Sequence, residues 1–224
     1  MRADYLALLP SLVRDDSGRL QPGDFELALT MAVARYSKDR PARPVSDAVV
    51  VARKIALPSD WTAGFSQLVA VEHPVGSIPP QLHDPATLIQ VYQAPDGIEL
   101  LALGLADGAQ VRLTITTPHA LSDLIDTIPA LDQEPVCCWA AAILCDQLAN
   151  AWANAGDSTI GADGSDNKTR STEFANRARG LRRRYLDDVG VQQQRTDTAS
   201  AVVAVQPTDS LGGPRLWHPA RRRY

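Results

Sequence analysis

The sequence predicts an α+β protein in which a helical bundle carries an inserted, mostly antiparallel β subdomain and an extended C-terminal arm. Apolar residues repeat at three- and four-residue steps in residues 1–44 and again in residues 129–190, which is the spacing of amphipathic helices. Residues 45–128 instead hold short runs of β-branched residues separated by turn sequences. Residues 191–224 show no sustained helical period. We therefore expect two N-terminal bundle helices, a β-rich insert, a C-terminal helical hairpin and an arm, in that order.

The N-terminal segment predicts two helices joined by a tight turn. The first covers residues 3–14 and ends at the turn sequence Asp15–Gly18. The second follows Pro22, where apolar residues recur at helical spacing to about residue 38, and Pro41 prevents its continuation.

The insert predicts a small antiparallel sheet. We expect strands at residues 49–57, 88–94, 97–104 and 109–117. Asp-Gly turn sequences separate the last three, which predicts a three-stranded meander over residues 88–117. Residues 61–72 favour a short helix, because Phe65, Leu68 and Val69 cluster at helical spacing.

The C-terminal hairpin is expected to consist of a helix after Pro129, a polar loop over residues 155–169 and a helix over residues 168–189. Gly190 is placed to end the second helix. The first helix contains all three cysteines, Cys137, Cys138 and Cys145. Their odd number and the absence of a CxxC spacing predict buried free thiols in a reducing compartment.

Composition and charge narrow the class of protein. Hydrophobic residues make up 45% of the 224 residues and charged residues 21%, which is typical of a soluble globular chain. No uninterrupted apolar run reaches the roughly 20 residues of a membrane span, so we expect no membrane partner. The net charge of −4 is unevenly distributed, because residues 168–224 hold 12 Lys and Arg against 5 Asp and Glu. A basic C-terminal quarter suits an acidic partner or nucleic acid, although a solvated helix face explains it equally well.

The sequence contains no recognisable catalytic or cofactor-binding motif. The four histidines lack metal-ligand spacing, and His119 is expected to have a structural role. Asp157, Asp163 and Asp166 favour a polar turn over a calcium site, because the closing Glu of an EF-hand loop is missing. The cluster Arg182–Arg184 predicts side chains that fan outward into solvent, with non-specific phosphate contact as the alternative. We therefore expect no cofactor, no metal and no enzymatic activity.

The order of several segments resembles a family of tailed-phage head–tail connector (adaptor) proteins. The similar segments are residues 15–41, TTPHAL (116–121), TIPA (127–130), the helix holding Trp139 to Trp152, and GDSTIGADGSDNKTRSTEFANRARGLRRRYLDDVG (156–190). In that family a helix–loop–helix carries a Ser-Thr-Ile-x-Ala-Asp-type loop and an Arg-rich stretch that closes with Tyr. Gly164 departs from the Val that is frequent in the family pattern. The resemblance covers roughly residues 1–190.

The resemblance implies a structural subunit that forms a ring, usually of twelve copies, beneath the portal. Such a ring closes the neck, receives the tail and lets DNA pass, with non-specific DNA contact in the channel. The expected partners are the portal protein and a tail or neck protein. The expected location is the neck of the virion, and the host cytoplasm during assembly. A tail completion or terminator ring, a nucleic-acid-binding regulator and an enzyme of unrecognised class are the alternatives.

The arm, residues 191–224, lies beyond this resemblance. Val203 and Val205 are spaced to point one way from an extended chain, which suits addition to a sheet edge of another subunit. Trp217 is a candidate aromatic anchor. Arg221, Arg222 and Arg223 are candidates for contact with an acidic portal surface or with DNA phosphate. An unstructured end with no docking role is the alternative.

Overall fold

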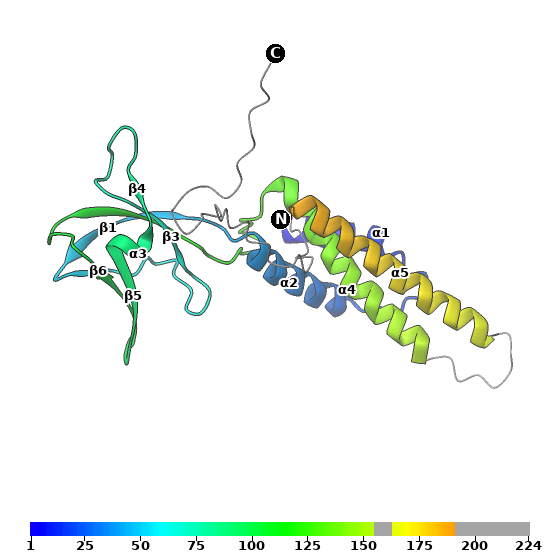
Figure 1. The fold of residues 1–224 in the computed structure, drawn as a ribbon. Helices are drawn as coiled ribbons and strands as arrows, with labels where there is room; N and C mark the ends of the chain where they lie inside the picture. The colour runs from blue at the N-terminus through cyan, green and yellow to red at the C-terminus, as the bar shows by residue number, and fades with distance from the viewer. Residues whose placement is uncertain (155–162, 191–224) are drawn as a thin grey trace, which may run out of the picture. The chain divides into compact units, whose positions relative to one another are not determined.

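The computed structural model describes residues 1–154 and 163–190, with the backbone alone for residues 163–168. The chain divides into two units, Met1–Val191 and Gln192–Tyr224, and the fold presented here is that of the first. It combines helices with a curled antiparallel sheet (Figure 1). The helices are α1 (Arg2–Val13), α2 (Pro22–Asp39), α3 (Pro85–Leu88), α4 (Gln133–Asn154) and α5 (Asp163–Val189). The strands are β1 (Val45–Val51), β2 (Lys54–Ile55), β3 (Leu68–Glu72), β4 (Leu82–His83), β5 (Ile89–Ala94), β6 (Gly97–Ala102) and β7 (Gln110–Ile115).

The two N-terminal helices and their tight turn are confirmed. The Asp15 carboxylate accepts the backbone N–H groups of Ser17, Arg19 and Leu20, and a carboxylate placed in this way stabilises a turn. α2 begins at Pro22, whose missing N–H costs nothing at the first helical position.

Helices α1, α2, α4 and α5 enclose one apolar cluster, which we call the helical core. Its largest fully buried side chains are Tyr5, Leu9, Leu29, Tyr36, Leu144, Leu148 and Tyr185. α5 packs along α4, and α1 and α2 both pack against α4 (Figure 1). The three cysteines are buried and free, as predicted.

Helix α4 is long, apolar and largely buried, with residues from Val136 to Trp152 in the helical core. Together with the preceding 3₁₀ turn (Ala130–Asp132), it spans Ala130–Asn154, which is long and apolar enough to cross a membrane by length and composition alone. The apolar run is not continuous, because Asp132, Glu134 and Asp146 interrupt it. In the structure, 61% of an apolar 18-residue window within this stretch is buried. Since α1, α2 and α5 cover it, we assign α4 to the helical core.

The seven strands form one sheet in the order β4-β3-β7-β1-β2-β6-β5, with every neighbouring pair antiparallel. Its inner face forms a second apolar cluster, the sheet core, whose buried members include Val50, Val71, Leu100, Val111, Leu113 and Ile115. The one-turn helix α3 connects the two edge strands along the chain and contacts both β3 and β5.

Three details of the insert were predicted wrongly. Residues 49–57 do not form one strand, because the chain reverses at Ala52 and Arg53 between β1 and β2. Residues 61–72 do not form a helix, and their second half is strand β3, which pairs with β7. The β5–β6 hairpin is confirmed, but β7 pairs with β1 and β3, so residues 88–117 are not a meander.

In the C-terminal hairpin, the predicted end of the second helix is closer to the structure than its predicted start. α5 starts at Asp163, inside the predicted loop 155–169, and ends at Val189 as expected. Gly190 has a φ of 72°, the left-handed conformation that favours glycine after a helix. Residues 155–162 of the loop lie outside the described residues.

Candidate interaction surfaces

The segment that joins β7 to α4, residues 116–128, fastens the sheet to the end of α2. Thr117 and Ala42 exchange two backbone hydrogen bonds of 2.9 and 3.0 Å. The backbone N–H of His119 donates to Ser37 Oγ at 2.9 Å, and its Nε2 lies 3.0 Å from the carbonyl oxygen of Arg40. Its Nδ1 lies 2.9 Å from the carbonyl oxygen of Thr127 and 3.1 Å from the hydroxyl oxygen of the same residue, which can donate to it when the ring proton is on Nε2. Both ring nitrogens are therefore engaged, and the predicted structural role of His119 is confirmed.

An open apolar groove of 380 Å³ lies beside this junction, and we call it the α2 groove. Arg2 and Lys38 contribute the charged groups of its lining. The lining residues of α2 are Leu29, Thr30, Val33, Ala34, Ser37 and Lys38, joined by Arg2, Phe65, Pro118, His119 and Leu121.

The apolar surface continues beyond the groove along α2. Leu27 and Met31 are 55% and 51% exposed, and they precede Ala34 and Lys38 on the same helical stripe. The sequence analysis missed this surface because it followed only the stripe that faces the helical core. The signal was present, since α2 carries a second apolar stripe that no predicted element covers.

Polar pairs buried in the helical core lie behind the groove. The hydroxyl of Tyr36 donates to Asp132 Oδ2 at 2.5 Å, and Arg40 contacts the same carboxylate at 2.9 Å. The hydroxyl of Tyr185 donates to Asp39 Oδ2 at 2.8 Å. Burial, and then the hydrogen bond to a carboxylate, raise the pKa of both tyrosines. These groups satisfy one another, so they fix α2 in place and offer no free acid or base.

The arginine cluster of α5 is mostly paired with acidic residues. Arg182 forms an ion pair with Asp146 of α4, and Arg184 contacts Glu134 of α4 at 2.6 Å. Arg183 is 86% exposed at its side chain. The prediction that the side chains fan outward is confirmed for Arg183 and Arg184, which are exposed, whereas Arg182 turns towards Asp146 on the adjacent helix and is only partly exposed.

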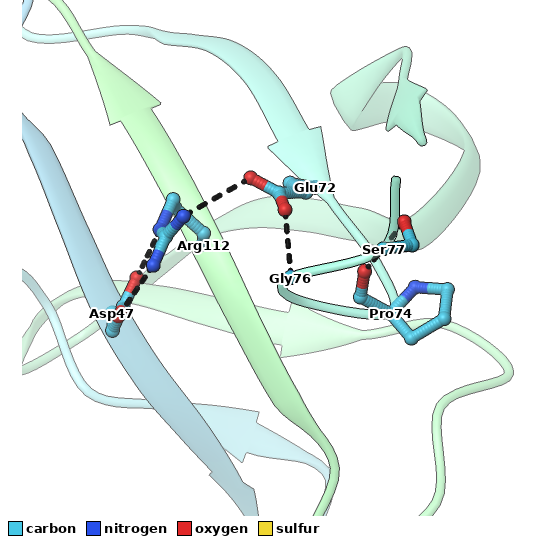
Figure 2. A network of polar contacts seen from close by, with 6 residues as sticks. All are labelled: Asp47, Glu72, Pro74, Gly76, Ser77 and Arg112. Carbon is cyan, nitrogen blue, oxygen red and sulfur yellow. Dashed lines mark hydrogen bonds and ion pairs between the residues drawn. The ribbon is translucent and has the colours of Figure 1, made fainter. Parts of the chain in front are cut away.

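A second polar network crosses the outer face of the sheet (Figure 2). Arg112 of β7 donates to both carboxylate oxygens of Asp47 on β1, at 2.6 and 3.0 Å, and contacts Glu72 of β3 at 3.4 Å. Glu72 is 7% exposed and accepts the N–H of Gly76 at 2.9 Å. The hydrogen bond from Arg112 lowers the pKa of Asp47. The network ties three strands to the β3–β4 loop and gives each oxygen of the Glu72 carboxylate a partner.

Several predicted sites fall outside what the structure describes. The docking residues assigned to the arm, Val203, Val205, Trp217, Arg221, Arg222 and Arg223, all lie beyond residue 190. Asp157 and the side chains of Asp163 and Asp166 also lie outside the described residues. Within the described ranges, no cluster of three or more His, Cys, Asp or Glu side chains is placed to hold a metal ion.

Comparison with known proteins adds no relative. No protein-family model matches the chain, and no curated protein matches it.

Proposed function

We propose that this chain is a structural subunit of a tailed-phage head–tail connector, which assembles into a ring beneath the portal and joins the head to the tail. Helices α1, α2, α4 and α5 are the adaptor's bundle in this proposal, residues 45–128 are its β-rich insert, and residues 191–224 are its docking arm. The ring has twelve copies, as the resemblance implies, and it surrounds the channel through which DNA passes. The subunit belongs to the virion neck and resides in the host cytoplasm until assembly.

The α2 groove is the observation that carries the proposal. Contiguous apolar patches on a soluble protein mark interaction sites more often than inert surface. Here an apolar groove continues into Leu27 and Met31, which are about half exposed. A ring subunit must bury surface against a neighbour on each side, so we assign this surface to contact with a second copy of the chain.

The polar groups of the described residues favour a structural role over a catalytic one. An active site needs ionisable groups that converge on a cavity with free hydrogen-bonding capacity. The α2 groove contains His119, but its Nε2 contacts the carbonyl oxygen of Arg40 and its Nδ1 contacts Thr127, so both ring nitrogens have partners. Arg182 and Arg184 are paired within the helices, which weakens the case for a nucleic-acid-binding regulator.

Mass photometry and electron microscopy of the purified protein, with and without portal, test the proposal. We expect the wild-type chain to form rings on the portal, and we expect Leu27→Asp/Met31→Asp to abolish them. Ile78→Asp is the matched control, because Ile78 is 97% exposed at the tip of the β3–β4 loop and lies away from the groove lining. Two outcomes would contradict the proposal. The wild-type protein could remain monomeric and fail to bind the portal, or the double variant could form normal rings. Rings that form only on tail-tube protein would instead support a tail completion or terminator role.

The arm is tested separately by ending the chain at residue 190. We expect the shortened protein to keep near-normal thermal stability, because residues 1–190 contain the helical and sheet cores that the structure describes. We also expect it to fail to attach to portal-bearing heads, since Trp217 and Arg221–Arg223 would be missing. Normal attachment and infectious particles would exclude a docking role for the arm.

A further inference from the structure

The two edges of the sheet differ in how well they are protected. β4 is an edge of two residues, and Pro79 and Pro80 precede it closely. β5 is an edge of six residues, IQVYQA, and pairs along its whole length with β6 alone. Natural edge strands are usually shortened, charged or interrupted by proline, because an open edge invites another strand. β5 carries none of these protections.

The register shows which backbone groups of β5 face outward. The N–H of Ala102 donates to Arg53 at 2.8 Å, so Ala102 directs its backbone polar groups towards β2. Backbone groups alternate in direction along an antiparallel strand, so Leu101 and Glu99 face β5. Their partners on β5 are Gln90 and Tyr92. It follows that Val91 and Gln93 direct their N–H and C=O groups away from the sheet. The side chains of Val91 and Tyr92 are 48% and 46% exposed.

We propose that residues 201–205 of a second copy of this chain add as a strand to the open edge of β5. The inference rests on the proposed ring only in that it requires a neighbouring copy. The segment is Ala-Val-Val-Ala-Val, which is uncharged and rich in β-branched residues. Val203 and Val205 fall on one face of an extended chain, and Val202 on the other. Backbone hydrogen bonds to Val91 and Gln93 supply the attachment, and the alternating valines cover exposed apolar side chains of β5.

The chain length permits this exchange. Ten residues lie between Gly190, which follows α5, and Ala201, so eleven residue steps join the two. An extended chain of that length spans at most roughly 36–40 Å, which is comparable to the width of a small domain. The charges of the two segments also favour pairing. Neither β5 nor residues 201–205 carry a charged side chain that would have to be desolvated when the two strands pair.

Disulfide trapping between copies tests the exchange. One preparation carries Gln93→Cys and a second carries Val203→Cys, and the two are mixed under mild oxidation, alone and on portal. The native cysteines do not interfere, because all three are buried. We expect a cross-linked dimer from the mixture. A cross-link found only when both substitutions are in the same chain, or no cross-link in either setting, would overturn the proposal.

A proline at residue 91 makes the test specific for the edge. Val91→Pro removes an outward N–H and leaves the hydrogen bonds of Gln90 and Tyr92 to β6 in place. Val91→Lys is a second edge-blocking variant that requires no change of backbone, and Val91→Thr is the matched control that keeps the N–H and the shape. We expect trapping to fall about tenfold in both blocked variants and to persist in the control. Undiminished trapping in the blocked variants would contradict strand addition.

One outcome separates strand exchange from the connector proposal. Rings that assemble on portal without any cross-link between Gln93→Cys and Val203→Cys would reject strand exchange and leave the connector proposal intact.

Discussion

The helical core and the sheet core bury their residues by different means. The helical core contains Tyr5, Tyr36 and Tyr185, each at most 1% exposed, and each hydroxyl donates to a carboxylate. The buried residues of the sheet core are aliphatic, and the outer face of β1 leaves Val45 and Val51 more than half exposed. The buried tyrosine hydroxyls of the helical core are therefore all hydrogen-bonded, whereas the sheet buries aliphatic residues on its inner face and leaves valines exposed on its outer face.

This difference suggests a division of labour. Buried phenol–carboxylate pairs specify one arrangement of helices, because a misplaced helix would leave a buried polar group unpaired. A sheet with an open six-residue edge can accept another strand without any change in its own core. We infer that the interior of the helices fixes the scaffold of the subunit, and that the α2 groove on its surface and the open edge of β5 supply the contacts between copies.

The largest effect is expected from Tyr185, which is fully buried in the helical core. Tyr185→Ala should lower the free energy of unfolding by about 3–5 kcal/mol, because it leaves a cavity beside Trp139, whose ring centroid lies 4.8 Å away. Tyr185→Phe is the control, and it should cost only about 1 kcal/mol for the lost bond to Asp39. Urea denaturation followed by tryptophan fluorescence measures both. A cost below about 0.5 kcal/mol for the alanine variant would mean that the helical core does not depend on this side chain.

Alkaline pH should weaken the helical core before the sheet. Burial raises the pKa of Cys137 from 9.0 to about 12, and that of Cys138 and Cys145 to about 11. The neutral thiol is thus favoured in the folded state, so this stabilisation is complete below pH 9 and is lost as pH rises through about 11–12. Tyr36 and Tyr185 also make the free energy of unfolding fall above pH 10, because burial raises the pKa of each phenol in the folded state.

Urea denaturation between about pH 8 and about pH 10.5 measures this loss. We expect the free energy of unfolding to fall with increasing pH, and to fall less steeply in a variant with all three cysteines changed to alanine. Amide hydrogen exchange at the higher pH should show α4 opening before β7. A flat profile between these pH values would show that the thiols are not held neutral by burial.

The sequence predicted the helices well because their signals are local. Phe25, Leu29 and Tyr36 repeat at helical spacing within one segment, and Asp15 marks the end of α1 without reference to any distant residue. The sheet order depends on pairings between distant segments. β3 was taken for a helix because Phe65, Leu68 and Val69 also fit helical spacing, and only pairing with β7 decides in favour of a strand.

The interaction surfaces could be predicted only in part. The second apolar stripe on α2, with Leu27 and Met31, is visible in the sequence once the first stripe is assigned to the core. The groove beside it is not, because Phe65 and Leu121 come from other parts of the chain. The open edge of β5 could not be predicted either, because the predicted meander did not give the order of all seven strands in the sheet.

A moderate effect is expected where the β3–β4 loop joins the sheet. Glu72→Ala removes the carboxylate that accepts the N–H of Gly76 and contacts Arg112. We expect a loss of about 1–2 kcal/mol and faster hydrogen exchange at the Gly76 amide. Ser77→Ala is the control within the same loop (Figure 2), because its hydroxyl makes an exposed bond of 3.2 Å to Pro74, and we expect it to be nearly neutral. Equal effects of the two substitutions would show that the network does not hold the loop.

The smallest effect should be a gain in stability at the β1–β2 turn. Ala52 and Arg53 have φ values of 50° and 61°, the left-handed conformation that side chains with a Cβ disfavour. Both are exposed, and Arg53 is held by its backbone, whose N–H donates to Asp107 at 3.0 Å. Asn-Gly is the preferred pair for such a two-residue turn.

We therefore expect Ala52→Asn/Arg53→Gly to raise the free energy of unfolding by about 0.5–1 kcal/mol, after subtraction of the extra unfolded-state entropy of glycine. Arg53→Val is the opposing variant, and it should destabilise the protein because a β-branched residue tolerates this conformation poorly. Because the turn lies in the sheet, the gain should appear in hydrogen exchange of β2 and leave α4 unchanged. A gain spread equally over α4 would mean that the two cores unfold as one cooperative unit, and it would remove the division of labour between them.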